Sequence, residues 1–224
     1  MCGFPKDYFY YYKAWWSTVP SLHVFPHWNW PGKEGSIVSV WVYSNLDEVE
    51  LIVNGKSLGR QKVPHLGHLQ WKVTYAPGYI EARGFKNGKR VLRERRATTG
   101  APAALRLSAD RRQINSDGED VSMVKVEVLD RAGNPVPTAQ NKIAFKISGP
   151  GNLIGVGNGD PNCQESDKLP SRSLFNGLAQ AIIQAGTVPG SIVIEARVEG
   201  DDSHPIAPAK LILTAEPARR RPIV

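Results

Sequence analysis

Long apolar runs are absent from this sequence of 224 residues, and cysteine is scarce. No stretch approaches the roughly 20 apolar residues that a membrane helix needs, so we expect no membrane partner. The two cysteines, Cys2 and Cys163, lie far apart in the sequence. Two such thiols provide neither a disulfide framework nor the ligand spacing of a zinc site, so we expect both to be free.

The short motifs of common catalytic sites are also missing. There is no P-loop, no HExxH, no CxxC and no G-x-S-x-G segment. The glycines of Gly155–Gly159 do not stand between a predicted strand and a predicted helix, so we interpret them as a structural loop. His23 and His27 are four residues apart, but Pro26 interrupts the helix that would align them on zinc.

Acidic residues gather at 117–120 and 160–167, both in predicted turns. Carboxylates in turns usually accept hydrogen bonds from nearby backbone N–H groups. A calcium site on either segment stays open as an alternative, although the D-x-D-x-D-G pattern is absent. We therefore assign no catalytic residue, no metal ligand and no cofactor from the residues themselves.

The formal charge is +7, but no nucleic-acid-binding motif accompanies it. Much of the excess lies in Arg90–Arg96 and in Arg219, Arg220 and Arg221. The first segment alternates with apolar residues, as in an edge strand whose charges discourage edge-to-edge pairing. The second is typical of a solvated tail. We expect no nucleic-acid partner.

What the sequence has in abundance is turn residues and alternating strands. Glycine and proline total 38 of 224 residues, which favours many turns. Asn54-Gly55 and Asn87-Gly88 are typical of two-residue hairpins. Leu22–Gly35 and Ser148–Ser173 show no strand period and are expected to be irregular. The pattern predicts strands over Ile37–Tyr43, Val49–Val53, Leu69–Tyr75, Tyr79–Phe85, Lys89–Ala97, Leu105–Ser108, Met123–Leu129, Ile143–Ile147, Ala179–Ala185, Ser191–Val198 and Lys210–Ala215.

Aromatic residues crowd the beginning of the sequence. We expect Asp7 to cap a helix that begins at Tyr8, and this helix is aromatic on all sides. Such a helix should be buried on most sides, which indicates a larger partner. Trp41 and Trp71 lie inside alternating strands and are expected in a core. Trp28 and Trp30 are candidates for stacking on a sugar or for contact with that partner.

Several long strings carry a resemblance to a known family. They are GFPKDYFYYYKAWW, LHVFPHWNWPGKEG and VWVYSNLDEVELIVNGKSLG in the first half, and LSADRRQINSDGEDVSMVKVEVLDRAGNPVP, ISGPGNLIGVGNGDP and FNGLAQAIIQ in the second. Together they resemble the C-terminal region of family 2 glycoside hydrolases of the bacterial β-galactosidase type. The resemblance covers nearly the whole chain.

The resemblance implies an all-β fold. Two tandem immunoglobulin-like antiparallel β-sandwiches would follow a short helix that remains from a (β/α)8 barrel. Residues 1–22 would be the remnant of the last β/α unit, 23–100 the first sandwich, 101–217 the second and 218–224 a basic tail. A linker is expected at Thr98–Ala104, where small residues, Gly and Pro interrupt the strands.

The resemblance also implies what this chain would not do. The family's two catalytic glutamates lie in the barrel, and no position here matches either, so the chain alone is expected to be inactive. Lys6, in the GFPKD loop, would border the sugar pocket of an intact enzyme. The expected partner is the upstream barrel.

The first residues show no basic segment followed by an apolar core, so no signal peptide is recognised. This favours a chain kept in the cytoplasm or a piece of a longer protein, and its localisation stays open. The resemblance implies a periplasmic or secreted bacterial parent enzyme.

Two other functions stay open at this point. One is a carbohydrate-binding module that uses the aromatic residues and the Gly155–Asn162 loop, with a glycan as partner. The other is an adhesion or protein-interaction module, because immunoglobulin-like sandwiches serve many unrelated functions.

Overall fold

The computed structural model describes residues 4–200 and 206–218, which divide into two compact units. The first unit covers residues 3–98 and the second begins at Thr99. Cys2, His204 and the basic segment 219–221 lie outside the described residues. In the described part of the chain, no helix is long and apolar enough to span a membrane.

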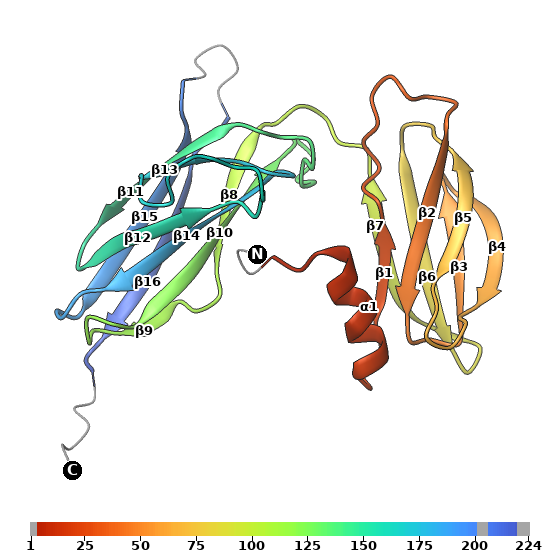
Figure 1. Ribbon diagram of the computed structural model, residues 1–224, viewed down its shortest axis with the longest axis horizontal. Helices are drawn as coiled ribbons and strands as arrows, with labels where there is room; N and C mark the ends of the chain where they lie inside the picture. The colour runs from red at the N-terminus through yellow and green to blue at the C-terminus, as the bar shows by residue number, and fades with distance from the viewer. Residues whose placement is uncertain (1–3, 201–205, 219–224) are drawn as a thin grey trace. The chain divides into compact units, whose positions relative to one another are not determined.

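The first unit is one helix on a β-sandwich (Figure 1). Its helix is α1 (Asp7–Trp16). One sheet has the order β1 (Leu22–Phe25), β2 (Ile37–Ser44), β5 (Leu69–Thr74); the other has the order β4 (Lys56–Lys62), β3 (Glu48–Val53), β6 (Tyr79–Lys86), β7 (Lys89–Ala97).

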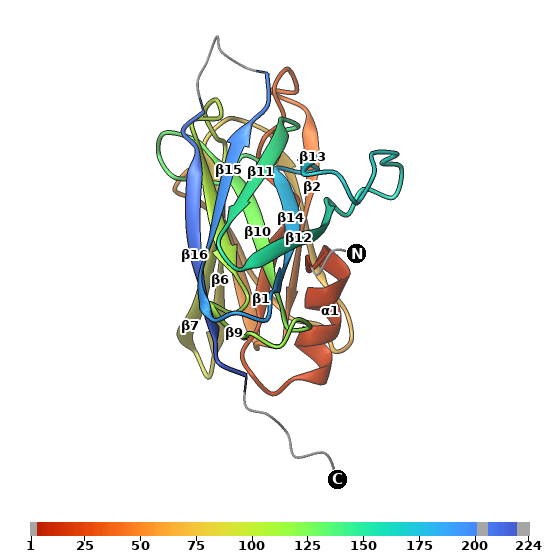
Figure 2. The same ribbon diagram turned by 90° about the vertical axis from the view of Figure 1, so that its left-hand side faces the viewer.

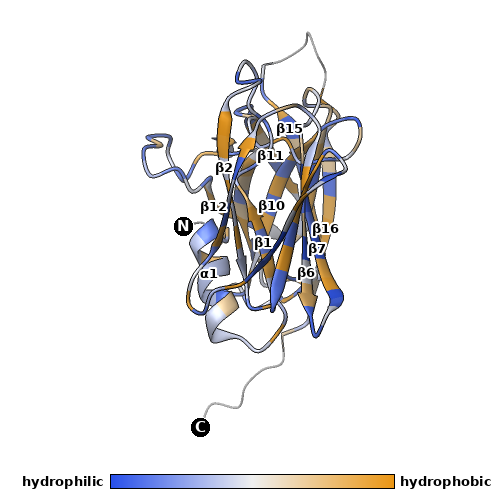
Figure 3. Cartoon of the chain, turned by 90° about the vertical axis from the view of Figure 1, so that its right-hand side faces the viewer, coloured by the Kyte–Doolittle hydropathy of each residue, from blue (hydrophilic) through white to orange (hydrophobic). Residues whose placement is uncertain are grey.

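Side chains of the two sheets alternate between the core and the surface, as the period of two predicts. In β5, Leu69, Trp71 and Val73 are buried while the residues between them are exposed. They pack with Val40 of the adjacent strand β2 and with Leu51 of β3 in the other sheet, in one apolar cluster. Each such side chain contributes about 1.5–3 kcal/mol by leaving water. Figure 3 shows this alternation of apolar and hydrophilic residues along the strands.

The second unit is also a β-sandwich, and its strands lie toward the viewer in Figure 2. One sheet has the order β12 (Gly151–Gly157), β14 (Leu178–Ala185), β10 (Val121–Leu129), β8 (Ala104–Ala109); the other has the order β13 (Ser171–Ser173), β11 (Lys142–Ser148), β15 (Gly190–Val198), β16 (Ala209–Glu216), β9 (Gln113–Asn115). All pairs are antiparallel except β16 with β9. The all-β expectation is confirmed.

Two segments that we expected to be irregular contain strands. Leu22–Phe25 forms β1, which pairs with β2 so that His23 lies opposite Tyr43. Within Ser148–Ser173 the chain forms β12 and β13. Gly155 and Gly157 therefore belong to a strand and not to the predicted loop. Glycine weakens a strand because it has no side chain to pack, but pairing with β14 provides the backbone hydrogen bonds.

Other local predictions have mixed outcomes. Asn54 and Asn87 have φ values of 47° and 51°, and each begins a hairpin turn, as expected. The arginine-rich segment forms β7 at a sheet edge, also as expected. Trp71 is buried in the core. Trp41 is not: it is half-buried on the other face of β2, where its ring stacks on His68 at 4.2 Å.

Candidate functional site

The helix α1 starts differently from the prediction. The capping position is Lys6, which is extended (φ −85°, ψ 168°) and makes no side-chain cap. Asp7 is inside the helix, and its carboxylate is a hydrogen-bond partner of the His23 ring, with Oδ1 2.9 Å from Nε2. Asp7 therefore connects the helix to the sandwich instead of satisfying the helix N–H groups.

His23 lies at the centre of a polar cluster between α1 and the sandwich. Its side chain is buried, and its ring stacks on Tyr10 with centroids 3.7 Å apart. Nδ1 lies 3.4 Å from both Glu94 Oε1 and Arg96 Nη2. When Nδ1 carries a proton it donates to Glu94, because it can then no longer accept a hydrogen bond from Arg96. Arg96 also pairs with Glu94 at 2.6 Å.

The electrostatics of this cluster favour the charged imidazolium. Burial alone would lower the pKa of His23, but the hydrogen bonds to Asp7 and Glu94 outweigh it, and the pKa lies above the ordinary value. Both carboxylates are thus engaged by cationic or imidazole groups. They hold the helix in place and do not face each other across a substrate pocket.

The inner side of α1 packs on the outer face of the β1–β2–β5 sheet. Ala14 is buried, and the Tyr11 ring meets the edge of Tyr43 at 5.4 Å. The Tyr11 hydroxyl donates a 2.8 Å hydrogen bond to the carbonyl of Leu66. Trp15 contacts His65 edge to face. The helix is therefore half covered by its own unit.

The outer side of α1 is an exposed row of aromatic rings. Tyr8, Tyr12 and Trp16 lie four residues apart, so they share one face of the helix. Their exposed fractions are 72%, 48% and 82%, and the rings of Tyr12 and Trp16 lie 4.7 Å apart. Phe9 and Val19 extend this exposure. Exposed large side chains gathered in this way are typical of an interface. We call Tyr8, Tyr12 and Trp16 the outer aromatic face.

Of the predicted site residues, Lys6 is exposed just before α1. Trp28 was expected at the surface but lies in the core. The Trp28 side chain is fully buried, and its indole N–H donates to the carbonyl of Ala76 at 3.0 Å. Its expected contact with a sugar or with a partner is wrong, because the ring fills the core of the first sandwich.

Trp30 is half-buried and already engaged. Its ring stacks on His27 at 4.4 Å, and its indole N–H donates to the His27 carbonyl. The ammonium group of Lys33 lies 5.3 Å from the ring centroid. These contacts occupy much of the ring that a sugar would need.

The acidic segments are held by hydrogen bonds within the second unit. Asp117 accepts from the N–H groups of Glu119 and Asp120, and these bonds lower the pKa of its carboxyl group. Asp120 accepts from Asn115 and Arg111. Among the described residues, no group of three or more His, Cys, Asp or Glu side chains is placed to hold a metal ion.

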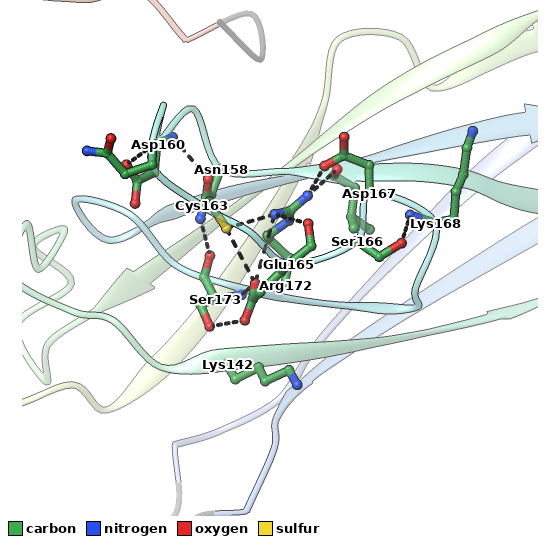
Figure 4. A network of polar contacts seen from close by, with 12 residues as sticks. Lys142, Asn158, Asp160, Cys163, Glu165, Ser166, Asp167, Lys168, Arg172 and Ser173 are labelled. Carbon is green, nitrogen blue, oxygen red and sulfur yellow. Dashed lines mark hydrogen bonds and ion pairs between the residues drawn. The ribbon is translucent and has the colours of Figure 1, made fainter.

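The 158–170 segment is organised by a buried arginine that the sequence patterns did not single out (Figure 4). Nη1 of Arg172 donates to the sulfur of Cys163 at 2.9 Å and to the carbonyl of Glu165 at 3.2 Å. Nη2 donates to the carbonyl of Val156 and pairs with Asp167. Cys163 is a free thiol, as expected. The network fastens an irregular loop to the sheet.

The Glu165 carboxylate completes this network. It accepts from the hydroxyl and the N–H of Ser173, at 2.6 and 2.8 Å. Burial would raise the pKa of Glu165, but these bonds and the charge of Arg172 hold it below its ordinary value. Both terminal nitrogens of Arg172 and both oxygens of Glu165 are engaged, whereas the buried Nε of Arg172 has no hydrogen-bond partner among the described residues. Because the partners all belong to the loop and to the strands beneath it, the arrangement is structural.

Comparison with known families agrees with these features. Residues 105–207 match the family described as Glycoside hydrolase family 2 C-terminal domain 5, and residues 35–92 match a Domain of unknown function (DUF4982). The chain belongs to glycoside hydrolase family 2 and corresponds to the C-terminal region of its members. The expected resemblance is confirmed.

Two relatives of this glycoside hydrolase family 2 chain are much longer proteins. Beta-galactosidase BoGH2A of Bacteroides ovatus is 42% identical over 204 residues, which are 89% of this chain and 24% of that protein. A putative beta-glucuronidase of Formosa agariphila is 37% identical over 207 residues, which are 90% of this chain and 20% of that protein. The chain therefore spans a quarter or less of the length of these relatives.

Solved structures of the family have the same fold. A beta-glycosidase from Bacteroides vulgatus matches with a TM-score of 0.89 at 32% identity, over 96% of this chain and 27% of that one. A beta-glucuronidase from glycoside hydrolase family 2 matches with a TM-score of 0.81 at 30% identity, over 97% of this chain and 22% of that one.

Proposed function

We propose that this chain is the non-catalytic C-terminal part of a larger family 2 glycoside hydrolase of the β-galactosidase or β-glucuronidase type. The observation that carries the proposal is the division of α1 into two sides. One side is fastened to the first sandwich through His23, and the other presents Tyr8, Tyr12 and Trp16 to solvent. The outer aromatic face is the surface that packs on the catalytic barrel of the intact enzyme.

The partner is argued from length and from chemistry. The Bacteroides ovatus and Formosa agariphila relatives have roughly three quarters or more of their length outside the region that matches this chain. Within the described residues the acidic side chains that lie near one another are engaged by Arg, His or backbone N–H groups. The hydrolytic carboxylates of the intact enzyme therefore belong to the barrel, and the role of this chain is to support it.

Complementation tests this proposal. The region of the Bacteroides ovatus relative that matches this chain is deleted, and the purified chain is added to the remainder. We expect the addition to restore hydrolysis of an aryl β-galactoside or to raise the thermal midpoint of the truncated enzyme. The chain alone should hydrolyse neither aryl β-galactosides nor aryl β-glucuronides.

A matched pair of variants makes the test specific to the helix. Changing Tyr8, Tyr12 and Trp16 together to Ser should abolish complementation. Changing Leu169 and Val188 to Ser removes exposed apolar side chains of the second unit instead, and should leave it intact. Equal loss in both variants, or turnover by the chain alone, would contradict the proposal.

Lys6 belongs to the same proposal as a residue at the border of the sugar pocket. Its exposed side chain precedes α1, on backbone that is extended. In the complemented enzyme, Lys6→Ala should raise the KM for an aryl β-galactoside more than it lowers kcat, because a border residue binds substrate without entering the chemistry. An unchanged KM would remove Lys6 from the pocket.

A further inference from the structure

A groove lies on the outer face of the second sandwich, on a surface that includes none of the site residues predicted from the sequence. It has a volume of about 620 Å³ and crosses three neighbouring strands, β11, β15 and β16. Figure 2 shows these strands. The side chains that point outward along it are Ala144, Lys146, Glu195, Arg197, Pro208 and Lys210.

The strand register arranges these side chains in two rows. Ala144 lies opposite Arg197, and Lys146 lies opposite Glu195. On the other side of β15, Glu195 lies opposite Lys210. One row is thus Lys, Glu, Lys, and the other has Arg197 beside the small side chain of Ala144. The alternate residues Phe145 and Ala196 are buried in the core, which fixes the outward direction of the rows.

The charges in the groove are not balanced. Glu195 pairs weakly with Lys210, at 3.7 Å. Arg197 and Lys146 are exposed, and neither has an ion pair or side-chain hydrogen bond among the described residues. Among the described residues that line the groove, three cations against one carboxylate leave an excess of positive charge around a recess. A guanidinium beside a recess is suited to bidentate binding of a carboxylate.

We propose that this groove binds an acidic sugar, that is, a pyranose ring that carries a carboxylate. Arg197 binds the carboxylate, and Lys146 and Lys210 add attraction from either side of Glu195. The Glu195 carboxylate accepts hydrogen bonds from sugar hydroxyls, and Ala144 and Pro208 form an apolar floor for the C–H face of the ring. This assignment is independent of the role of α1.

Three features favour a sugar over a bare anion or an acidic peptide. The volume lies in the range of about 300–1,000 Å³ that small organic ligands occupy, which is much more than an inorganic ion needs. The Glu195 carboxylate is an acceptor that needs a donor, which sugar hydroxyls supply and the carboxylate side chains of an acidic peptide do not. Strand β15 is paired on both sides at Glu195, so a peptide finds no free backbone groups there.

Calorimetric titration of the full chain tests the proposal with defined probes. Trigalacturonate should bind, and its affinity should fall as salt is raised. A neutral galactose trisaccharide, inorganic phosphate and a poly-aspartate peptide should each bind at least about tenfold more weakly, the factor that one charge-assisted hydrogen bond provides.

Variants locate the site. Arg197→Gln and, separately, Lys146→Gln should each weaken trigalacturonate binding, the first by about tenfold or more. Lys142→Gln is the matched control. It removes one positive charge from the same face of β11, where Lys142 pairs with Glu199 at 3.3 Å, outside the groove. Circular dichroism checks that each variant is folded.

The proposal is overturned if trigalacturonate does not bind, or if Lys142→Gln weakens binding as much as Arg197→Gln. Equal affinity for the neutral trisaccharide would remove the role of Arg197. Equal affinity for phosphate would reduce the groove to a general anion site, and tighter binding of the peptide would assign it to an acidic protein partner. Each of these results contradicts an acidic-sugar site.

Discussion

The carboxylate of Asp7, at the first residue of α1, lies 2.9 Å from Nε2 of His23 on β1. The carboxylates of Asp7 and of Glu94 on β7 both contact the buried imidazole ring of His23. One titratable ring thus connects the helix to both sheets of the first sandwich, since β1 and β7 belong to different sheets. The outer aromatic face can be presented to a partner only while this connection holds α1.

The stability of the first unit should therefore fall as the pH rises. A histidine with a raised folded pKa contributes stability that is complete below the unfolded pKa and is lost as the pH rises through the folded pKa. Urea unfolding of the full chain from about pH 5.5 to about pH 8.5, followed by tryptophan fluorescence, covers the window above the ordinary histidine pKa. His23→Gln should flatten the decline.

His27 provides a control of opposite sign. Burial lowers the pKa of His27, so its contribution is complete above the unfolded pKa and is lost as the pH falls. His27→Gln should therefore make the decline with rising pH steeper. The same pH slope in the wild type and in His23→Gln would show that the Asp7 contact contributes no linkage.

Two adjacent tryptophans should differ in their effect on stability. Trp16 is exposed on the outer aromatic face, whereas Trp15 is half-buried against His65. We expect Trp16→Ala to change the free energy of unfolding by less than about 0.5 kcal/mol. Trp15→Ala should cost about 1–3 kcal/mol, because it exposes the surface under the helix. Denaturant titration distinguishes them; equal costs would mean that Trp16 is also packed.

Periodicity in the sequence was sufficient to predict most strands but not the contacts that hold α1. Val121–Leu129 alternates over nine residues, so its strand is readily predicted. Leu22–Phe25 has only four residues beside a proline, and it is a strand because β2 pairs with it. No local pattern states that His23 meets Asp7 and Glu94, which are 16 and 71 residues away in the sequence.

Burial was the second quantity that the sequence left undetermined. Trp28 and Trp30 have similar neighbours in the chain, yet one is fully buried and the other is half-buried. The difference arises from where the irregular segment crosses the sandwich, which depends on long-range packing against Tyr75. Arg172 was missed for the same reason, since its partners come from the folded loop around it.

Removing the buried guanidinium of Arg172 should destabilise the second unit strongly. Arg172→Met keeps the length of the side chain but removes the donors to Cys163, Glu165 and Val156. Breaking a buried ion network of this kind costs about 3–5 kcal/mol. Asp167→Asn is the control, because this carboxylate is largely exposed and its loss should cost less than about 1 kcal/mol. Similar midpoints for both variants would contradict the structural role of Arg172.

A pair of glycines tests the packing between the loop before β14 and Val136. Gly177 has φ +74°, and a Cβ added there would lie 2.2 Å from the Val136 carbonyl oxygen. Gly88 has nearly the same φ, +72°, with nothing within 4 Å of the added atom. Both alanine variants therefore bear a similar strain of about 1 kcal/mol from the left-handed conformation. Only Gly177→Ala must also displace backbone atoms, because the added Cβ clashes with the Val136 carbonyl.

We expect Gly177→Ala to cost at least about 2 kcal/mol more than Gly88→Ala, because the clash is with a carbonyl and not with a flexible side chain. The Gly177 N–H also donates to the Ala139 carbonyl at 3.1 Å, so movement of this turn breaks a hydrogen bond. The two variants are compared by thermal unfolding of the full chain. Equal losses would mean that the turn at Gly177 shifts freely, and that Val136 does not fix the position of β14.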